Sequence, residues 1–204
     1  MELELMFSEQ KWNILKCLSN GKYSPIQLAQ MLNTTMANIS QQLRLLEATN
    51  LVKKEKIKNR DKGKPRTLFS LNEDCAYIIP TMSNFAEKKL LKVEDHHRII
   101  LKIWFLVNPE LHSPLEKIYF RIEPHLKKIN FIGLMESSRK LVIASDDPGQ
   151  IEKTLGKVSG FEAVVLSTEN AKKLAKSLKS PFSSIESMSV IFNRDNIISQ
   201  GGGN

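Results

Sequence analysis

The chain has 204 residues, of which 41% are hydrophobic and 25% are charged, and its formal net charge is +8 at pH 7. This is the composition of a globular protein with room for one or two domains, and its positive charge favours nucleic acid, an anionic membrane or an acidic protein as partner. The start MELELMFSEQ lacks a signal-peptide pattern, and no apolar run approaches the roughly 20 residues that cross a bilayer. With two isolated cysteines, we expect a cytoplasmic protein without membrane contact or a disulfide framework.

Two short helices are expected first along the chain. Ser8 is a suitable N-cap for a helix that runs to about Asn20, where Asn20-Gly21 is expected to form a left-handed cap. Ser24-Pro25 begins a second helix, and Asn33 makes the turn that follows. The apolar residues expected to face inward are Trp12, Ile14, Leu15, Leu18, Ile26, Leu28, Ala29 and Leu32.

A third helix, from about Thr35 to Ala48, carries two different faces. Its apolar stripe consists of Met36, Ile39, Leu43 and Leu46. The other side carries neutral donors and acceptors with one cation, which are the side chains that reach base edges in a major groove. The candidate DNA-contacting residues are Thr34, Thr35, Asn38, Ser40, Gln41, Gln42 and Arg44, with Thr34 or Thr35 as the N-cap. Three such helices predict a helix-turn-helix.

A basic hairpin is predicted directly after these helices. Asn50 closes the third helix in a left-handed conformation, Leu51 to Ile57 reads as a strand, Asp61 to Lys64 as a turn and Thr67 to Leu71 as the return strand. Eight cations against two acids give this hairpin a net charge of +6, which suits contact with phosphates or the minor groove. A solvated loop is the alternative. The candidate wing cations are Lys53, Lys54, Lys56, Lys58, Arg60, Lys62, Lys64 and Arg66.

Residues 7–71 resemble the winged helix-turn-helix of the ArsR-type bacterial and archaeal repressors. The resemblance is carried by S-P-I-Q-L-A-Q-M-L, by N-I-S-Q-Q-L-R-L-L-E-A-T-N-L-V and by T-L-F-S-L. It implies a prokaryotic, here archaeal, transcriptional repressor that binds a palindromic operator in double-stranded DNA as a homodimer. Metal-sensing members carry a Cys-x-Cys box near the recognition helix, and this chain has no cysteine there. We therefore expect no metal and no cofactor, and an unidentified small molecule as the effector.

The segment from Tyr77 to Val107 is expected to be helical, with limits set by Pro80 and Asn108-Pro109. Its surplus of apolar residues favours dimerisation, and the alternative is a helix that only joins two domains. Its adjacent His96 and His97 point to different faces of a helix and make a poor metal-chelating pair. The apolar residues are Phe85, Leu90, Leu91, Val93, Ile99, Ile100, Ile103, Trp104 and Leu106.

Strands alternate with helices in the rest of the chain, which predicts a small α/β domain and an α+β fold class for the whole. Strands are expected over residues 131–135, 140–144, 161–166 and 188–192, and helices over 115–129, 150–158 and 170–178, the first interrupted by Pro124. The predicted organisation is a winged helix-turn-helix over residues 1–73, a helical connector over 74–108, the α/β domain over 109–198 and a disordered tail over 199–204.

The α/β domain weakly resembles small prokaryotic nucleotidyltransferase domains. The resemblance is carried by F-I-G-L-M-E-S-S-R, F-E-A-V-V-L-S-T-E-N-A-K-K-L and S-P-F-S-S-I-E-S-M-S-V-I-F-N-R-D. Arg139 and Lys140 stand where such enzymes need metal-binding acids, and Asp146 and Asp147 are placed to cap the next helix. We therefore expect a degenerate domain without catalytic residues, kept for dimerisation or ligand sensing. The alternatives are an unrelated domain, a nucleotidyltransferase-like enzyme fused to a nucleic-acid-binding module, and a winged helix that contacts only proteins.

Overall fold

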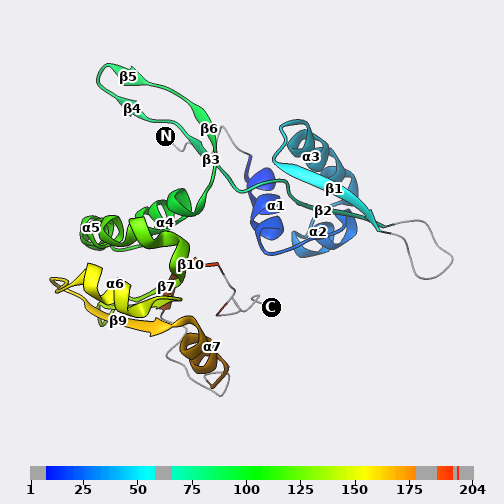
Figure 1. Ribbon diagram of the computed structural model, residues 1–204. Coiled ribbons are helices and arrows are strands. Elements are labelled where there is room, and N and C mark those ends of the chain that lie inside the picture. Colours follow the sequence, from blue (N-terminus) through cyan, green and yellow to red (C-terminus); the bar gives the residue numbers. More distant parts are fainter. Residues whose placement is uncertain (1–7, 58–65, 178–187, 195–196, 198–204) are drawn as a thin grey trace. The chain divides into compact units, whose positions relative to one another are not determined.

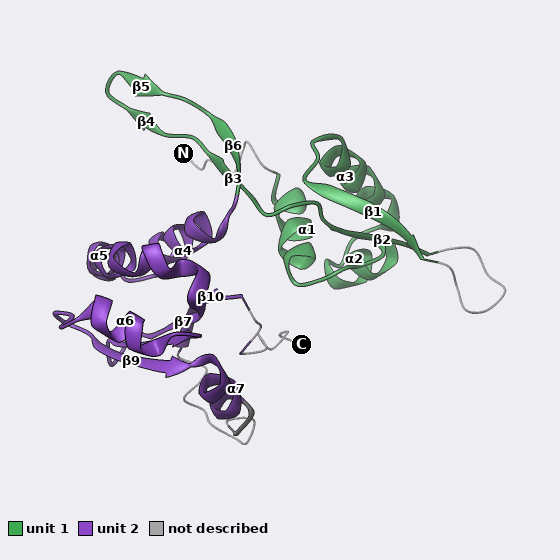
Figure 2. Cartoon of the chain, in the orientation of Figure 1, with its two compact units in different colours: residues 1–92 green, residues 93–204 purple. Residues whose placement is uncertain are grey.

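A computed structural model describes residues 8–57, 66–177, 188–194 and 197 of the chain. The chain divides into two compact units, residues 1–92 and residues 93–204 (Figure 2). The first unit contains the three N-terminal helices and the basic hairpin, and the second contains a four-stranded sheet with the remaining helices. The predicted tail over residues 199–204 lies outside the described residues. The mixture of helices and strands confirms the α+β fold class.

Three helices form the first part of unit 1, namely α1 (Glu9–Ser19), α2 (Pro25–Met31) and α3 (Met36–Ala48). Ser24 and Gln27 form a capping box at the start of α2, which confirms the predicted helix start. Asn33 (φ 47°) and Asn50 (φ 61°) adopt the left-handed conformation, as predicted for a turn and a cap. The predicted left-handed cap at Asn20 is wrong, because its φ is −96° and α1 ends in ordinary helical geometry.

Most of the apolar residues predicted to face inward on the three helices are buried in the core of unit 1, but three of them are exposed. Its buried side chains include Ile14, Leu18, Leu28, Ala29, Ile39, Leu43, Leu46, Val52 and Phe69. Trp12, Ile26 and Met36 were expected to face inward, and their exposed fractions are 52%, 57% and 54%. Ile26 and Met36 lie in the first turns of α2 and α3. Trp12 lies at the edge of the α1 stripe, with the Lys16 ammonium 6.0 Å from its ring centre.

The predicted wing strands are β1 (Val52–Ile57) and β2 (Arg66–Leu71), which pair antiparallel from Val52↔Leu71 to Ile57↔Arg66. Backbone hydrogen bonds of 3.0 and 2.8 Å join Tyr23 to Phe69 in both directions. This bridge ties β2 to the segment between α1 and α2. Because Phe69 is also buried in the core of unit 1, the wing strands and the helices form one packed body.

Residues 75–92 form a β-ribbon, so the predicted helix is wrong over this segment (Figure 1). The ribbon comprises β3 (Cys75–Ile78), β4 (Thr81–Met82), β5 (Phe85–Ala86) and β6 (Lys89–Lys92), with β3 paired to β6 and β4 to β5. Pro80 opposes a helix, and Asn84 (φ 63°) turns the chain so that Met82 pairs with Phe85. The pairing overrides the helix-forming preference of residues 87–91. Only α4 (Asp95–Trp104) bears out the predicted helical segment.

Unit 2 contains a sheet with the strand order β10-β7-β8-β9. The strands are β7 (Ile129–Met135), β8 (Lys140–Ser145), β9 (Glu162–Ser167) and β10 (Met188–Asn193), and only β8 and β9 are parallel. The remaining helices are η2 (Pro109–Leu111), α5 (His112–Ile122), η3 (Glu123–Lys128), α6 (Pro148–Leu155) and α7 (Thr168–Ser177). The predicted alternation is confirmed, and α5 gives way to η3 at Glu123, next to the predicted break at Pro124.

Each face of this sheet has its own hydrophobic core. Side chains from α4, α5 and α6, including Ile103, Ile118 and Ile151, pack with Ile132 and Ile143 of the sheet. On the opposite face, Ala171 of α7 packs with Phe131 and Ala144. Alternate residues of β7 and β8 therefore contribute to different cores, as the period of a strand requires.

Gly133 in β7 gives a test of the second core. A Cβ atom at Gly133 would lie 2.8 Å from both Met188 Sδ and the Phe131 ring, whereas a Cβ at Gly149 would meet nothing within 4 Å. We expect Gly133→Ala to lower the free energy of unfolding of unit 2 by about 1–3 kcal/mol through overpacking. Gly149→Ala, in the first turn of α6, is the matched control and should be neutral or slightly stabilising.

Urea unfolding followed by Trp104 fluorescence, in a Trp12→Phe background, measures this difference for unit 2 alone. Equal unfolding midpoints for the two glycine variants would contradict the close packing around Gly133.

Candidate nucleic-acid interface

The orientation of α3 follows from its buried side. Ile39, Leu43 and Leu46 are each at most 2% exposed, so the opposite side of the helix must face solvent. Gln41 and Arg44 lie on that side, three residues apart, and both are exposed. Neither side chain has a hydrogen bond or ion pair with the described part of the chain. Both are therefore available to an external partner.

A polar ladder runs beside this exposed side. Asn38 Nδ2 donates to Thr34 Oγ1 at 3.1 Å, and Gln42 Nε2 donates to Asn38 Oδ1 at 3.5 Å. Thr34, Asn38 and Gln42 are all partly buried. Gln42 Oε1 is buried and has no hydrogen-bond partner among the described residues. The ladder orients Asn38 and Gln42 along the flank of α3, and their polar groups reach solvent less directly than those of Gln41 and Arg44.

The other predicted residues of the helix have local roles as well. Thr35 Oγ1 accepts a hydrogen bond of 3.2 Å from Asn38 N as the N-cap, and Ser40 Oγ donates to Met36 O at 2.7 Å. Met36 was assigned to the core by its spacing, yet it is 54% exposed at the first position of α3. Its apolar side chain is thus a further candidate for contact with an external partner. The sequence analysis missed it because Met36 fits the regular spacing of the apolar stripe.

The described wing cations divide into paired and unpaired residues. Lys54 Nζ lies 2.8 Å from Glu47 Oε1 of α3, and Lys53 Nζ donates to Asn72 O at 3.1 Å. Lys56 and Arg66 are exposed and have no ion pair with the described residues. They lie on neighbouring positions of the ladder, since Ile57 pairs with Arg66 and Lys56 with Thr67. The remaining predicted cations lie outside the described residues, namely Lys58, Arg60, Lys62 and Lys64.

Lys22 also belongs to this basic region and was not predicted. Its Nζ atom lies 2.6 Å from Glu55 Oε2. The hydrogen bond from Lys22 and its positive charge, with a smaller effect of Lys53, lower the pKa of Glu55. The sequence alone did not reveal this pair, because Lys22 and Glu55 are separated by 33 residues. The only sign of it was the presence of one acid, Glu55, within a run of lysines. The pair neutralises the acid of β1 and so reduces its repulsion of an anionic partner.

In unit 2, the two cations that stand where metal-binding acids were considered, Arg139 and Lys140, form ion pairs. Lys140 Nζ lies 3.0 Å from Glu162 Oε1, and Arg139 Nη2 lies 3.9 Å from Glu110 Oε2. Asp146 Oδ1 accepts hydrogen bonds from Thr168 Oγ1 at 2.7 Å and from the buried Asn130 Nδ2 at 2.8 Å. These hydrogen bonds, that from Thr168 first, lower the pKa of Asp146. Asp146 thus links the start of β7 to the start of α7.

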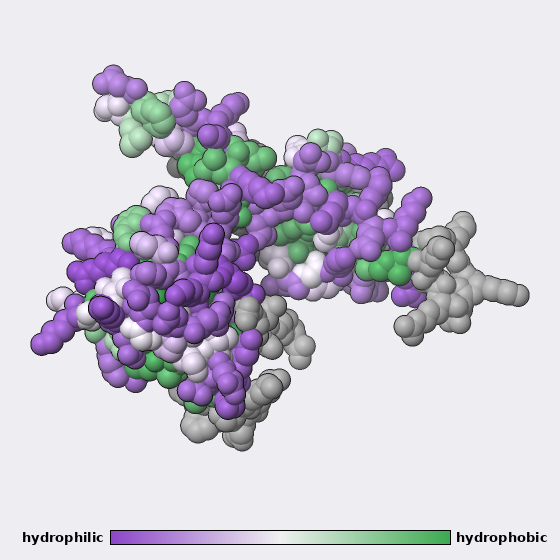
Figure 3. Space-filling model, in the orientation of Figure 1, coloured by the Kyte–Doolittle hydropathy of each residue, from purple (hydrophilic) through white to green (hydrophobic). Residues whose placement is uncertain are grey.

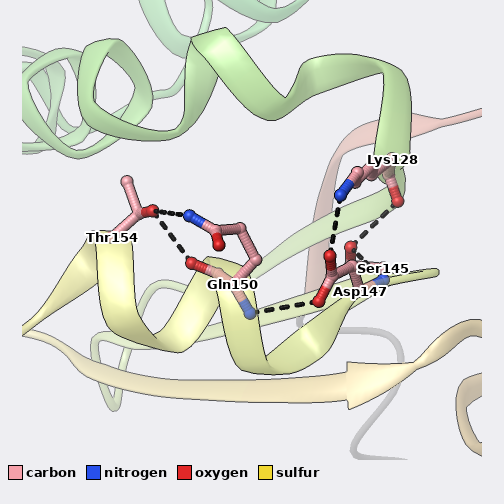
Figure 4. Close-up of polar contacts among 5 residues, drawn as sticks. All are labelled: Lys128, Ser145, Asp147, Gln150 and Thr154. Carbon is pink, nitrogen blue, oxygen red and sulfur yellow. Dashed lines mark hydrogen bonds and ion pairs between the residues drawn. The ribbon is translucent and has the colours of Figure 1, made fainter.

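Asp147 begins α6, as predicted (Figure 4). Its Oδ1 accepts a hydrogen bond of 3.2 Å from Gln150 N, and its Oδ2 lies 2.7 Å from Lys128 Nζ. The hydrogen bond from Lys128 is the main reason that the pKa of Asp147 is lowered. Ser145, which is fully buried, donates to Lys128 O at 2.9 Å. Both predicted acids therefore have structural partners at the junction of β8 and α6.

The two adjacent histidines have different neighbours. His96 Nδ1 lies 2.6 Å from Glu123 Oε1, whereas His97 Nδ1 accepts a hydrogen bond from Glu94 N at 3.3 Å. Within the described ranges, no group of three or more His, Cys, Asp or Glu side chains is placed to hold a metal ion. The same ranges contain no helix that is long and apolar enough to span a membrane.

Residues 8–54 match the family model described as bacterial regulatory protein, arsR family. The matched segment begins at the N-cap of α1 and ends inside β1, so it covers the three helices that carry the candidate interface. The chain therefore contains an ArsR-type helix-turn-helix domain, which supports a DNA-binding transcriptional regulator. A comparison with curated proteins found no match.

The hydrogen bonds of Asp146 predict a pH dependence. A lowered pKa in the folded state means that the carboxylate stabilises unit 2 above the unfolded pKa of about 3.9 and that this stability is lost as pH falls through the folded pKa. We expect the difference in free energy of unfolding between the wild type and Asp146→Asn to shrink as pH falls from about 6 to about 3. Urea unfolding at several pH values measures it. Glu152→Gln, an exposed acid on α6, is the control, and parallel curves for the two variants would refute the role of Asp146.

Proposed function

We propose that this protein is a sequence-specific transcriptional regulator that binds double-stranded DNA as a dimer. In this proposal α3 enters the major groove of each half-site, and the wing follows the phosphates or enters the adjacent minor groove. The observation that carries the proposal is the pair Gln41 and Arg44, exposed at the middle of α3 within the segment that matches the ArsR-type domain.

The chemistry of these side chains suits base recognition. A glutamine amide presents a donor and an acceptor to adenine N7 and N6, and a guanidinium presents two donors to guanine O6 and N7. Asn38 and Gln42 are oriented by the ladder that begins at Thr34, so they would meet the groove with few conformations to lose. Thr35 and Ser40 lie within the same segment and complete the proposed contact set.

The wing would supply affinity rather than sequence choice. Phosphate contacts fix the register of a protein on the duplex without reading its bases. Lys56 and Arg66 have no ion pair with the described residues, and Glu55 and Glu47 are paired with Lys22 and Lys54. The predicted cations Lys58, Arg60, Lys62 and Lys64 would extend this surface toward the turn of the hairpin.

Unit 2 would serve the regulator as a dimerisation or sensing domain in the cytoplasm, without catalysis. The positions of Asp146 and Asp147 support this view, because both carboxylates hold helix starts and strand ends together. A repressor that blocks transcription from a palindromic operator, released by an unidentified small molecule, is the form of regulation that the ArsR resemblance implies.

Selection of bound sequences from a pool of random duplexes, at near-physiological salt, tests the proposal directly. An enriched two-fold-symmetric sequence is the expected result. Salt-sensitive binding without any enriched sequence would contradict sequence-specific regulation and leave only general DNA binding. No binding at low salt would instead favour a winged helix that contacts proteins.

Loss of the Gln41 side chain should relax sequence choice. If Gln41 makes one bidentate base contact, Gln41→Ala lowers the discrimination between the operator and random DNA by about 1–3 kcal/mol. Asn38→Ala should have an effect in the same direction, with an added loss from the broken ladder to Thr34 and Gln42. Gln30→Ala, an exposed glutamine on α2, is the matched control. Competition binding measures the ratio, and unchanged discrimination for Gln41→Ala would place the reading surface elsewhere.

Loss of wing cations should weaken all duplexes alike. Lys56→Ala and Arg66→Ala should each reduce the slope of log K against log salt by about 0.9 per lost phosphate contact, without changing sequence preference. Lys62→Ala and Lys64→Ala test the predicted hairpin turn in the same way. Lys153→Ala on α6 is the control. A salt slope that stays constant in all four wing variants would remove the wing from the DNA.

A further inference from the structure

Met36 is an exposed apolar side chain at the first position of α3. It is 54% exposed and does not belong to the core of unit 1, which Ile39 and Leu43 of the same helix enter. Ala37, the next residue, is exposed as well. Hydrophilic residues cover most of the visible surface of the helices and wing strands of unit 1, with apolar residues in small areas (Figure 3). Met36 and Ala37 thus place apolar side chains on a surface that is mainly hydrophilic.

The polar side chains around the first turn of α3 have partners within unit 1. Thr35 Oγ1 accepts a hydrogen bond from Asn38 N, and Asn38 Nδ2 donates to Thr34 Oγ1. Ser40 Oγ, one turn further on, donates to Met36 O. These hydrogen bonds hold the backbone at the start of the helix. Because the Cα–Cβ bonds of a helix are tilted toward its beginning, a partner that meets the start of α3 also meets the Met36 side chain.

We propose that Met36 contacts the C5-methyl group of a thymine in each half-site and thereby selects a thymine–adenine pair at that position. The inference rests on the proposed function, in which α3 lies in the major groove and its first residues meet base edges. It extends that function because it assigns part of the sequence choice to an apolar side chain and names the base that this side chain selects.

The chemistry of the major groove leaves one kind of partner for an apolar side chain. The base edges there present hydrogen-bond donors and acceptors, and the thymine methyl group is their one apolar substituent. Contact with Met36 would remove this methyl group from water, which is favourable. The amino group of a cytosine or adenine at the same place would instead lose its hydrogen bonds to water without replacement. The flexible thioether chain of methionine adapts its shape to such a contact.

Gln41 and Arg44 do not provide this selection, because an amide and a guanidinium recognise hydrogen-bonding atoms of adenine and guanine. Met36 and Gln41 are five residues apart in α3. This separation is about 7.5 Å along the helix axis, whereas base pairs are about 3.4 Å apart. In a helix that follows the groove, the two side chains therefore lie opposite different base pairs. The thymine contact is thus an additional position of the operator, independent of Gln41.

Removal of the methyl group from the DNA tests the contact without any change in the protein. In the operator obtained from the duplex selection, each thymine is replaced in turn, in both half-sites, by deoxyuridine, whose base lacks only the methyl group. We expect the full chain to lose about 4-fold in affinity per half-site at one position, which is the factor for one covered methyl group. Competition binding at fixed salt measures this ratio.

Variants of the protein assign the effect to a side chain. Met36→Ala should bind the thymine and deoxyuridine operators equally well at that position. Met31→Ala is the matched control, because Met31, at the end of α2, is 53% exposed and should leave the ratio unchanged. Gln41→Ala should leave it unchanged as well. A selection repeated with Met36→Ala should lose the thymine at this position alone, and circular dichroism should show that all variants are folded.

The outcomes separate this proposal from the proposed function. A symmetric operator that binds equally well with deoxyuridine at every position, or that has no fixed thymine, overturns the methyl contact and keeps sequence-specific regulation. A methyl effect that persists in Met36→Ala, or that Met31→Ala removes instead, assigns the contact to another side chain and also overturns the proposal. A selection that enriches no duplex overturns both the methyl contact and the regulator.

Discussion

Burial of one side of α3 is the constraint on which unit 1 depends. Ile39, Leu43 and Leu46 fix the rotation of the helix about its axis, and this rotation decides which polar side chains face solvent. The same core includes Phe69, whose backbone is bonded to Tyr23, so the wing strands are attached to the packing that orients the helix. A change in this core would therefore alter α3 and the wing together, although neither Gln41 nor Lys56 is part of it.

Ion pairs determine which charged side chains of unit 1 remain unpaired at its surface. Glu47 of α3 and Glu55 of β1 form ion pairs with Lys54 and Lys22. Exposed pairs of this kind add little stability, so their main effect is on the local field. Lys56 and Arg66 are exposed and have no ion pair with the described residues. The exposed cations of the wing and the exposed polar side chains of α3 thus belong to different parts of one packed unit.

Local signals in the sequence predicted most of the fold, and contacts between distant residues account for the errors. The capping box at Ser24, the turn at Asn33 and the stripe of α3 depend on residues within a few positions of each other, and each was predicted. The ribbon was not, because residues 87–91 favour a helix locally and residues 89–92 form a strand only by pairing with residues 75–78. The candidate site shows the same division. Its residue types follow from the spacing, but the half-buried ladder of Asn38 and Gln42 and the pair of Lys22 with Glu55 required the fold.

The distribution of polar groups gives the two units different roles. In unit 2 the conspicuous polar side chains hold elements together: Asn130 and Thr168 bind Asp146, and Asp147 begins α6. These carboxylates accept hydrogen bonds from protein donors and so link the ends of strands to the starts of helices. In unit 1, Gln41, Arg44, Lys56 and Arg66 have no such partners among the described residues. Exposed polar and charged side chains without a partner in the described structure are thus found on α3 and the wing.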